Sequence, residues 1–509
     1  MERNIYGVLF DLSRLTEKHK YYFDMIPYLA DWGYNTILWH FTDDQGCALE
    51  IDSIKGISSS NAFSKKEMSN IIVHAEKYGI EIIPEIETLG HAGYIVRNPE
   101  YKHLLESQEG PDHFTICPSL HETIDIMEKL FKEVAELFPS QYVHAGLDEA
   151  HFGLCPLCWL RMQKSGNKNK LFSEYLKQMR EIALSNGKKT MVWSDMILKN
   201  KEVADDIPKD VVICDWHYTD IDNSSVEFFT RKGFNVICCP ASIHGGKIIY
   251  PGESNIENIK AFSKIAHQYK GIGVIGMVNT VWCPWRNLQA GVLHTIAFGG
   301  QIIRKDEICE DTFNIDFCRD FFGIDTNTQL QQAIQKIYSI SPELSLTLKL
   351  TPDNVDHLNS LTEDDLLKCK QIQKNGKDIW NIFVENLNSV KRNIEQYKEI
   401  ILSVEIMMKI ASDAEKINLL VKNGISDEKI LNNTEIKKAC KNLASVRRQL
   451  CKKVLDCWDL NRFENDNLRN FPSIRYRQID SLLNRLKGSS EFFRKLASCK
   501  SESTLVINN

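Results

Sequence analysis

Short apolar runs alternate with amphipathic helical stretches from the first residues of the chain to about residue 305. The runs are apolar on both faces, which is the pattern of parallel strands that are covered by helices. Helical patterns at residues 65–78, 124–138, 170–186 and 256–270 separate several of these runs. The expected strands are residues 5–11, 36–41, 80–86, 142–149, 190–196, 211–218, 235–241 and 274–282.

Eight strand–helix units in about 300 residues predict a (β/α)8 barrel, the TIM-barrel fold. An open, doubly wound sheet is the structural alternative, and such a sheet carries a glycine-rich phosphate loop after its first strand. Here the first strand is followed by Asp11-Leu-Ser-Arg14, which contains no glycine. The α/β barrel is therefore the favoured fold class.

The pattern becomes purely helical after about residue 325. Apolar residues recur at spacings of three and four over residues 436–454, and a longer apolar stripe covers residues 384–417. Thr362-Glu-Asp-Asp365 resembles a helix start. We expect a catalytic barrel at residues 1–325 and an all-α helical bundle at residues 326–509.

Charge and composition exclude several classes of partner. The formal net charge is −6, whereas proteins that bind nucleic acid or anionic membranes present a basic face. The sequence has no apolar run of membrane-spanning length, and its start does not resemble a secretory signal. Its 15 cysteines are scattered through apolar segments, as free thiols are in reducing compartments, so we expect a cytoplasmic protein.

One cysteine spacing is typical of metal sites. Cys155-Pro-Leu-Cys158 matches half of a structural zinc site, and Cys117 and His151 are candidates to complete it. A lone CxxC is weak support, because structural zinc needs four ligands. A thiol-containing loop without metal is the favoured interpretation.

Polar residues gather at the predicted strand ends, where TIM-barrel enzymes place their chemistry. Carboxylates end three successive strands, and aromatic residues end three later ones. Aromatic faces and carboxylates suit a sugar, and paired carboxylates perform the acid–base steps of glycoside hydrolysis.

The segment Tyr142-Val-His-Ala-Gly-Leu-Asp-Glu149 resembles the His-x-Gly-Gly-Asp-Glu motif of glycoside hydrolase family 20, the β-N-acetylhexosaminidases. Segments at 7–14, 40–44, 84–91, 192–195 and 281–282 resemble further strands of that family in the same order. Within that family, the sequence resembles the hexosaminidase D-like branch and bacterial members that have a helical C-terminal domain. Leu147 replaces the second motif glycine, and Glu87 stands where many members have aspartate.

The resemblance implies a retaining exo-β-N-acetylhexosaminidase that removes terminal β-linked GlcNAc or GalNAc through an oxazolinium ion, with no cofactor and no catalytic metal. Asp148 would hold the substrate's acetamido N–H, and Glu149 would act as general acid and base. The substrate would be bound by Arg14, Asp43, Glu87, His91, Trp193, Trp216, Tyr218 and Trp282. Tyr218 is only a substitute for a family tyrosine that we do not find on strand seven.

Alternatives remain open at this stage. A GalNAc-selective enzyme is one, and a catalytically decayed sugar-binding or scaffold protein is another. The expected partner is a glycan with a terminal N-acetylhexosamine, and a homodimer is left open. Pro284 occupies a position where many relatives carry a glutamate that grips the O4 side of the sugar, so weak discrimination between GlcNAc and GalNAc is expected.

Overall fold

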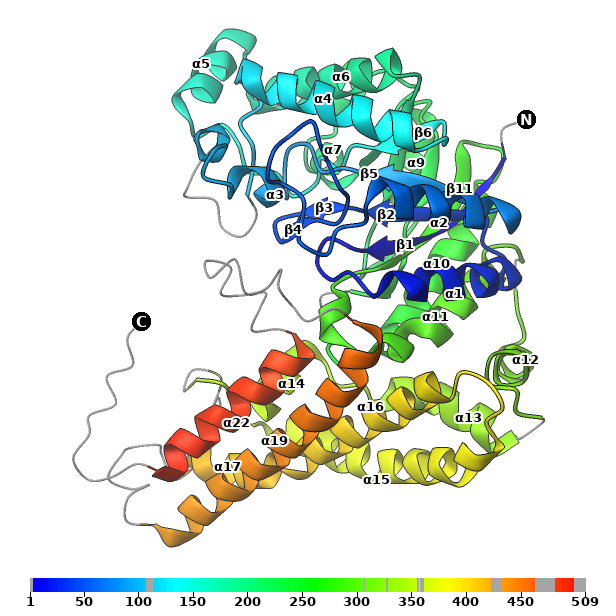
Figure 1. Cartoon of the computed structure of the whole chain (residues 1–509), viewed down its shortest axis with the longest axis vertical. Helices are drawn as coiled ribbons and strands as arrows, with labels where there is room; N and C mark the ends of the chain where they lie inside the picture. Colours follow the sequence, from blue (N-terminus) through cyan, green and yellow to red (C-terminus); the bar gives the residue numbers. More distant parts are fainter. Residues whose placement is uncertain are drawn as a thin grey trace.

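The computed structural model describes residues 3–106, 114–244, 246–305, 307–325, 328–354, 357, 361–422, 433–462 and 481–498. A barrel occupies one part of the molecule, and helices from the second half of the chain form the other part (Figure 1). None of the described helices has both the length and the apolarity that crossing a membrane requires.

Eight parallel strands close into a barrel, because the last strand pairs with the first. Each predicted apolar run contains one of these strands, so the (β/α)8 fold is confirmed. In order around the barrel they are β1 (Ile5–Asp11), β2 (Thr36–His40), β5 (Glu81–Glu85), β6 (Tyr142–His144), β7 (Lys189–Trp193), β8 (Val212–Asp215), β9 (Val236–Cys238) and β11 (Val274–Val281). The short strands β3 (Thr42–Asp43), β4 (Gly46–Cys47) and β10 (Ala241–Ile243) lie in the connections between them.

The barrel strands are buried on both faces, which explains their continuous apolar character. Leu9 of β1 points into a core inside the barrel, whereas Val8 and Phe10 pack outward against the helices. Trp193 belongs to the inner core, and Trp216 and Trp282 pack against it. The interior of the barrel is thus filled, and tryptophans form part of its top layer.

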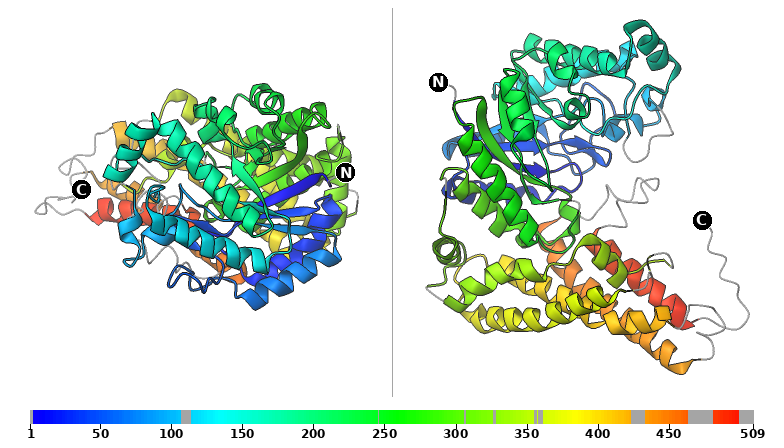
Figure 2. Two further views of the ribbon diagram at one scale, coloured as in Figure 1. Left: turned by 90° about the horizontal axis from the view of Figure 1, so that it is seen from above. Right: turned by 180° about the vertical axis from the view of Figure 1, so that it is seen from behind.

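Helices cover the outside of the barrel (Figure 2). The four helical patterns named from the sequence agree with α2, α4, α6 and α10 to within three residues at each end. α2 begins with a capping box in which Ser64 and Glu67 bond reciprocally. The helices of this part are α1 (His19–Trp32), α2 (Lys65–Lys77), α3 (Gly93–Val96), α4 (His121–Leu137), α5 (Pro156–Ser165), α6 (Lys168–Ser185), α7 (Asp195–Lys199), α8 (Val203–Asp206), α9 (Ser224–Arg231), α10 (Glu253–Gln268) and α11 (Leu293–Ile302).

The second half of the chain is helical, as predicted. Thr362 caps α15 through a capping box with Asp365. The apolar stripe at 384–417 is divided among three helices, because the chain turns after α15 and Asn393 (φ 51°) breaks the helical backbone. The described helices are α12 (Glu310–Phe322), α13 (Thr328–Lys336), α14 (Leu344–Leu350), α15 (Glu363–Asn386), α16 (Ile394–Ser412), α17 (Ala414–Lys422), α19 (Thr434–Asn461) and α22 (Leu482–Ser498).

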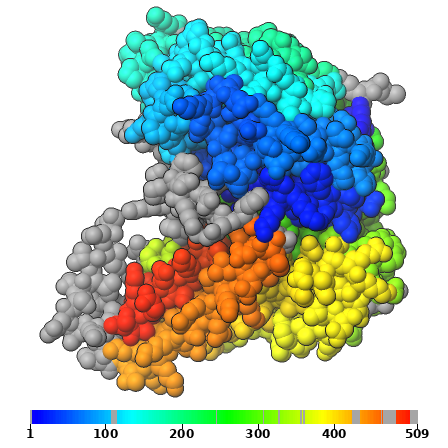
Figure 3. Space-filling view, in the orientation of Figure 1, coloured from blue at the N-terminus to red at the C-terminus, as the bar shows by residue number. Residues whose placement is uncertain are grey.

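Buried polar contacts join the helices to the barrel, and the two parts lie against each other in the space-filling view (Figure 3). Arg462, at the end of α19, pairs with Glu17 at 3.0 Å and donates to the carbonyl of Asn287 at 2.7 Å. Glu399 of α16 accepts a hydrogen bond from the Ala290 amide at 2.8 Å. The helical part therefore supports the connection that follows β11.

Candidate active site

Asp148 and Glu149 lie in a loop, which corrects the predicted strand at 142–149. β6 ends at His144, and Leu147 (φ 75°) and Glu149 (φ 47°) have left-handed backbone. An extended strand cannot continue through such residues. The loop conformation, not a strand, therefore sets the directions of the two carboxylates.

Two glycines allow the loops after β5 and β6 to touch. A Cβ on Gly90 would lie 2.1 Å from the carbonyl oxygen of Asp148, and one on Gly146 would lie 1.9 Å from Oε2 of Glu87. Real Cβ atoms do not approach other atoms this closely, so both positions require glycine. The close contact fixes the carboxylate loop against the loop that carries His91.

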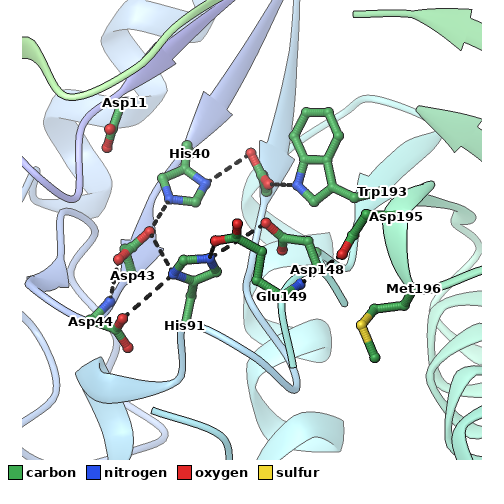
Figure 4. A network of polar contacts seen from close by, with 12 residues as sticks. Asp11, His40, Asp43, Asp44, His91, Asp148, Glu149, Trp193, Asp195 and Met196 are labelled. Carbon is green, nitrogen blue, oxygen red and sulfur yellow. Dashed lines mark hydrogen bonds and ion pairs between the residues drawn. The ribbon is translucent and has the colours of Figure 1, made fainter. Parts of the chain in front are cut away.

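His91 joins Asp148 and Glu149 to a second pair of acids, Asp43 and Asp44 (Figure 4). Its Nε2 lies 3.2 Å from Glu149 Oε2 and 3.5 Å from Asp148 Oδ2. Its Nδ1 lies 3.4 Å from Asp43 and 3.5 Å from Asp44. Burial acts to lower the pKa of His91, but the charges of Asp43 and Asp148 outweigh it and raise the pKa well above its usual value. The raised pKa favours the imidazolium form, which lies between the two pairs of acids.

The acids beneath the site are held in different protonation states. Burial acts to raise the pKa of Asp148, but His91 outweighs it and the pKa is lowered, so Asp148 is ionised. Burial and the charge of Asp148 raise the pKa of Glu87 well above its usual value, which favours its protonated form. Oδ1 of Asp148 is buried and receives no hydrogen bond from any described residue.

Asp43 holds Arg14 in the site. Oδ2 of Asp43 lies 2.5 Å from the Arg14 guanidinium and 3.0 Å from Nε2 of His40. Arg14 also pairs with Asp11 at 2.9 Å, and its guanidinium carbon lies 5.4 Å from the centre of the Trp282 ring. These contacts give Arg14 one orientation before any ligand arrives.

Glu85, buried beneath the cavity, orients the side chain of Trp193. It accepts a hydrogen bond from the Trp193 indole at 2.7 Å and pairs with Nδ1 of His40 at 3.0 Å. Burial acts to lower the pKa of His40, but Glu85 outweighs it and the pKa rises to about 10. Trp193 packs edge-on against Trp282, with ring centres 5.8 Å apart. The aromatic faces are thus oriented by charged groups.

Aromatic side chains also follow β8. The Trp216 and Tyr218 rings lie 5.1 Å apart, and Tyr218 stacks on His244 with ring centres 4.6 Å apart. His217, between them in sequence, is held by Ser225 at 3.1 Å. Trp216 and Tyr218 therefore line one wall of the cavity.

The strand ends enclose a cavity of about 360 Å³. Eight of the ten predicted site residues line it, namely Arg14, His91, Asp148, Glu149, Trp193, Trp216, Tyr218 and Trp282. Asp43 and Glu87 differ from the prediction, because both are fully buried beneath the cavity and contact its lining residues instead. A larger cavity of about 550 Å³ lies between α1 and α12, away from the strand ends that carry the paired carboxylates.

Sequence reasoning missed two residues of the lining, Cys283 and Arg286. Both follow the last strand, in a segment without a recognisable motif. Cys283 has φ 54°, and its amide donates to Asp11 at 3.0 Å, so the chain turns toward the end of β1 after leaving β11. The side chain of Arg286 thereby reaches a site that its place in the sequence did not indicate.

The site also contains three overlapping groups of histidine and acidic side chains with ligand-like spacing. They are His40/Glu85/Glu87, Asp43/Asp44/His91 and His91/Asp148/Glu149. In each group the histidine already pairs with carboxylates. The arrangement is suited to acid–base and hydrogen-bonding chemistry on an uncharged polar ligand.

Residues 5–251 match the model of the glycosyl hydrolase family 20 catalytic domain. The chain is 26% identical over 270 residues to a β-hexosaminidase of Vibrio furnissii, a match covering 46% of this chain and 42% of that protein. It is 29% identical over 213 residues to the β-hexosaminidase β-subunit of Rattus norvegicus, covering 37% of this chain and 38% of the relative. The chain thus spans less than half the length of either relative.

The crystal structure of a β-N-acetylhexosaminidase from Bacteroides fragilis has a similar fold, with a TM-score of 0.53 and 20% identity. That alignment covers 63% of this chain and 70% of the other. The family match lies on the barrel and includes the loops that carry the paired carboxylates, His91, Trp193 and Trp216, whereas Trp282 lies beyond it. Residues 5–251 of the barrel thus carry a glycoside hydrolase family 20 catalytic domain.

Proposed function

We propose that this protein is a retaining exo-β-N-acetylhexosaminidase, which removes terminal β-linked GlcNAc or GalNAc from a glycan or glycoconjugate. In this reaction the 2-acetamido oxygen of the substrate attacks the anomeric carbon and expels the aglycone. Water then opens the resulting oxazolinium ion, so two inversions give overall retention. Family 20 enzymes use this substrate-assisted route instead of a carboxylate nucleophile.

The observation that carries the proposal is the state of Asp148. It is ionised, and contacts with the side chains of His91 and Glu87 help to lower its pKa. Apart from these contacts, its buried Oδ1 has no donor among the described residues. A buried acceptor without a donor is costly unless a ligand supplies one. The acetamido N–H of the substrate is a donor of the required kind. Accepting from it would orient the acetamido group and stabilise the positive charge of the oxazolinium ion.

Glu149 suits the role of general acid and base. Its side chain is 39% exposed, whereas that of Asp148 is only 14% exposed, so Glu149 lies nearer the cavity mouth. A leaving group departs toward solvent, where Glu149 can protonate its oxygen and then deprotonate the incoming water. His91, 3.2 Å away, orients the carboxylate for both steps.

The remaining cavity groups suit a sugar ring with an apolar substituent. Trp193, Trp216 and Trp282 offer apolar faces for the acetamido methyl group and the ring. The Trp282 indole N–H is buried and donates to no described residue, so it is free to bond a substrate oxygen. Arg14 supplies a charged donor beside it.

A substrate panel tests the proposal. Aryl β-glycosides of GlcNAc, GalNAc and glucose differ in the acetamido group and in O4. We expect turnover of at least one N-acetylated sugar and almost none of the glucoside. Proton NMR should show the β-anomer as the first product. Equal rates on glucoside and N-acetylglucosaminide, or an initial α-anomer, would contradict the mechanism, and no turnover of any sugar would favour a sugar-binding protein.

A further inference from the structure

Three cysteine sulfur atoms converge beside the carboxylate loop. Cys117 lies in the connection between β5 and α4, Cys155 caps the N-terminus of α5, and Cys158 lies in the first turn of that helix. Sγ of Cys117 lies 3.5 Å from Sγ of Cys155 and 3.6 Å from Sγ of Cys158. All three sulfur atoms lie within 4.8 Å of one another. The barrel thus brings a cysteine to the CxxC segment from about 40 residues earlier in the chain.

We propose that Cys117, Cys155 and Cys158 bind one zinc ion as thiolates. Zinc–sulfur bonds of about 2.3 Å place the ligands of a tetrahedral site about 3.8 Å apart. The two measured sulfur–sulfur distances are close to this value. Three thiols give up three protons as they bind the metal, so the site gains one positive ion and loses three protons.

The local backbone directs a hydrogen-bond donor at one of the three sulfur atoms. The Cys158 amide donates to Sγ of Cys155 at 3.3 Å, and both residues lie at the positive end of α5. Cys117 and Cys158 are buried, so their sulfur atoms face one another rather than bulk water. Two cysteines would suffice for a disulfide, whereas the convergence of a third sulfur is expected for a metal.

The fourth position is assigned to water. The described residues contribute no further histidine, cysteine or carboxylate to the group. His151, the other candidate from the sequence, is exposed and does not join it. Ser119 Oγ lies 3.1 Å from Sγ of Cys158 and can hydrogen-bond a ligand at the open side.

The location would let the ion connect two segments of the chain beside the carboxylate loop. Cys155 follows Glu149 by six residues, and Cys117 belongs to the segment that packs against this loop. Oε1 of buried Glu106 accepts hydrogen bonds from three successive amides of this loop. They belong to Gly153, Leu154 and Cys155, at 2.7, 2.9 and 3.1 Å. Glu106 therefore holds one side of the loop. Zinc would link the other side of this loop to the segment that carries Cys117, and would thereby limit movement of the carboxylate loop. It would take no part in bond cleavage.

Metal analysis of the purified full chain tests the site independently of any glycosidase activity. Protein expressed with added zinc and dialysed under reducing conditions should hold about one zinc per chain by mass spectrometry of the elements. Cys117→Ser and Cys155→Ser should each lower the zinc content at least fivefold. Cys309→Ser is the matched control, because Cys309 also precedes a helix but is exposed and remote from the cluster.

Cobalt substitution of the wild type needs no variant. Bound Co²⁺ should give the near-ultraviolet charge-transfer absorption of thiolate ligands, and stoichiometric zinc should abolish it. Wild-type protein that takes up neither metal overturns the proposal. So does a zinc content that is equal in Cys155→Ser and Cys309→Ser, or an intact mass two hydrogen atoms lighter that shows a Cys117–Cys155 or Cys155–Cys158 disulfide.

Discussion

Gly90 lies directly against the backbone carbonyl of Asp148, and a Cβ at residue 90 would fall 2.1 Å from that oxygen. Gly90→Ala must therefore push the carboxylate loop away. We expect destabilisation of about 1–3 kcal/mol, the usual cost of overpacking. We also expect a loss of kcat of about 100-fold, because displacement of a catalytic group by about 1 Å has that effect.

Thermal unfolding and steady-state kinetics measure the two effects. Gly291→Ala is the matched control, since its Cβ would lie 3.4 Å from the nearest atom, an ordinary contact. A Gly90→Ala enzyme with wild-type kcat would show that the loop position does not matter for catalysis.

Glu149→Gln keeps the shape of the side chain but removes its proton exchange. Turnover should fall by roughly 10²–10⁴-fold, which is the usual contribution of a general acid. Aryl glycosides with very good leaving groups should lose less in the first step, because their oxygen needs little protonation. Glu122→Gln, on the exposed surface of α4, is the control and should retain full activity. Equal losses with good and poor leaving groups would argue against Glu149 as the acid.

Asp148→Ala removes the proposed acceptor of the acetamido N–H. Rates on N-acetylated substrates should fall by at least 100-fold, comparable to the loss of one donor from a charge-stabilising site. A thiazoline analogue of the oxazolinium ion should inhibit the wild type strongly and bind this variant much more weakly. Isothermal titration with the inactive Glu149→Gln protein as reference measures the binding. Undiminished affinity in Asp148→Ala would remove Asp148 from the acetamido site.

The raised pKa of Asp195 predicts that the stability of the fold changes with pH. Burial and the charge of Asp148 raise its pKa from 3.8 to about 6, while its Oδ2 accepts the Glu149 amide. A raised pKa means that the protonated form favours folding, so this stability is fully present below about pH 4 and is lost as the pH rises through 6. The pKa shift of Asp195 from 3.8 to about 6 corresponds to a loss of about 3 kcal/mol in the free energy of unfolding.

Asp195→Asn cannot ionise and should escape that loss. Urea unfolding of both proteins at pH 4.5 and pH 8 measures the effect. From the lower to the higher pH, the free energy of unfolding of Asp195→Asn should rise relative to that of the wild type. A constant difference between the two proteins at both values would contradict the assigned pKa.

Discrimination between GlcNAc and GalNAc should be weak. By resemblance, Pro284 stands where many family members have a glutamate that binds O4, and sites that lack a hydroxyl partner reject the wrong isomer poorly. We expect the two kcat/KM values to lie within a factor of about 100, or ~2.7 kcal/mol. Arg286 lines the cavity and is the residue that could restore selectivity. A preference above about a thousandfold that Arg286→Ala abolishes would assign the O4 contact to this arginine.

The order of the elements follows from local patterns alone. Apolar runs at residues 5–11 and 274–282, and the runs between them, predict the strands because burial on both faces leaves a continuous apolar signal. Strand ends in a barrel lie on one face, so the polar residues after each run could be collected into one candidate site before any coordinates. Most of those residues do line the cavity.

Contacts between loops could not be predicted from local sequence patterns. The left-handed backbone at Leu147 carries no periodic signal, and the depth of Asp43 and Glu87 depends on which loop packs above them. The approach of Arg286 to the cavity and of Cys117 to Cys155 requires the barrel to close first. Periodicity records only which face of an element is buried, whereas the distances between side chains far apart in the sequence arise from packing of the whole chain.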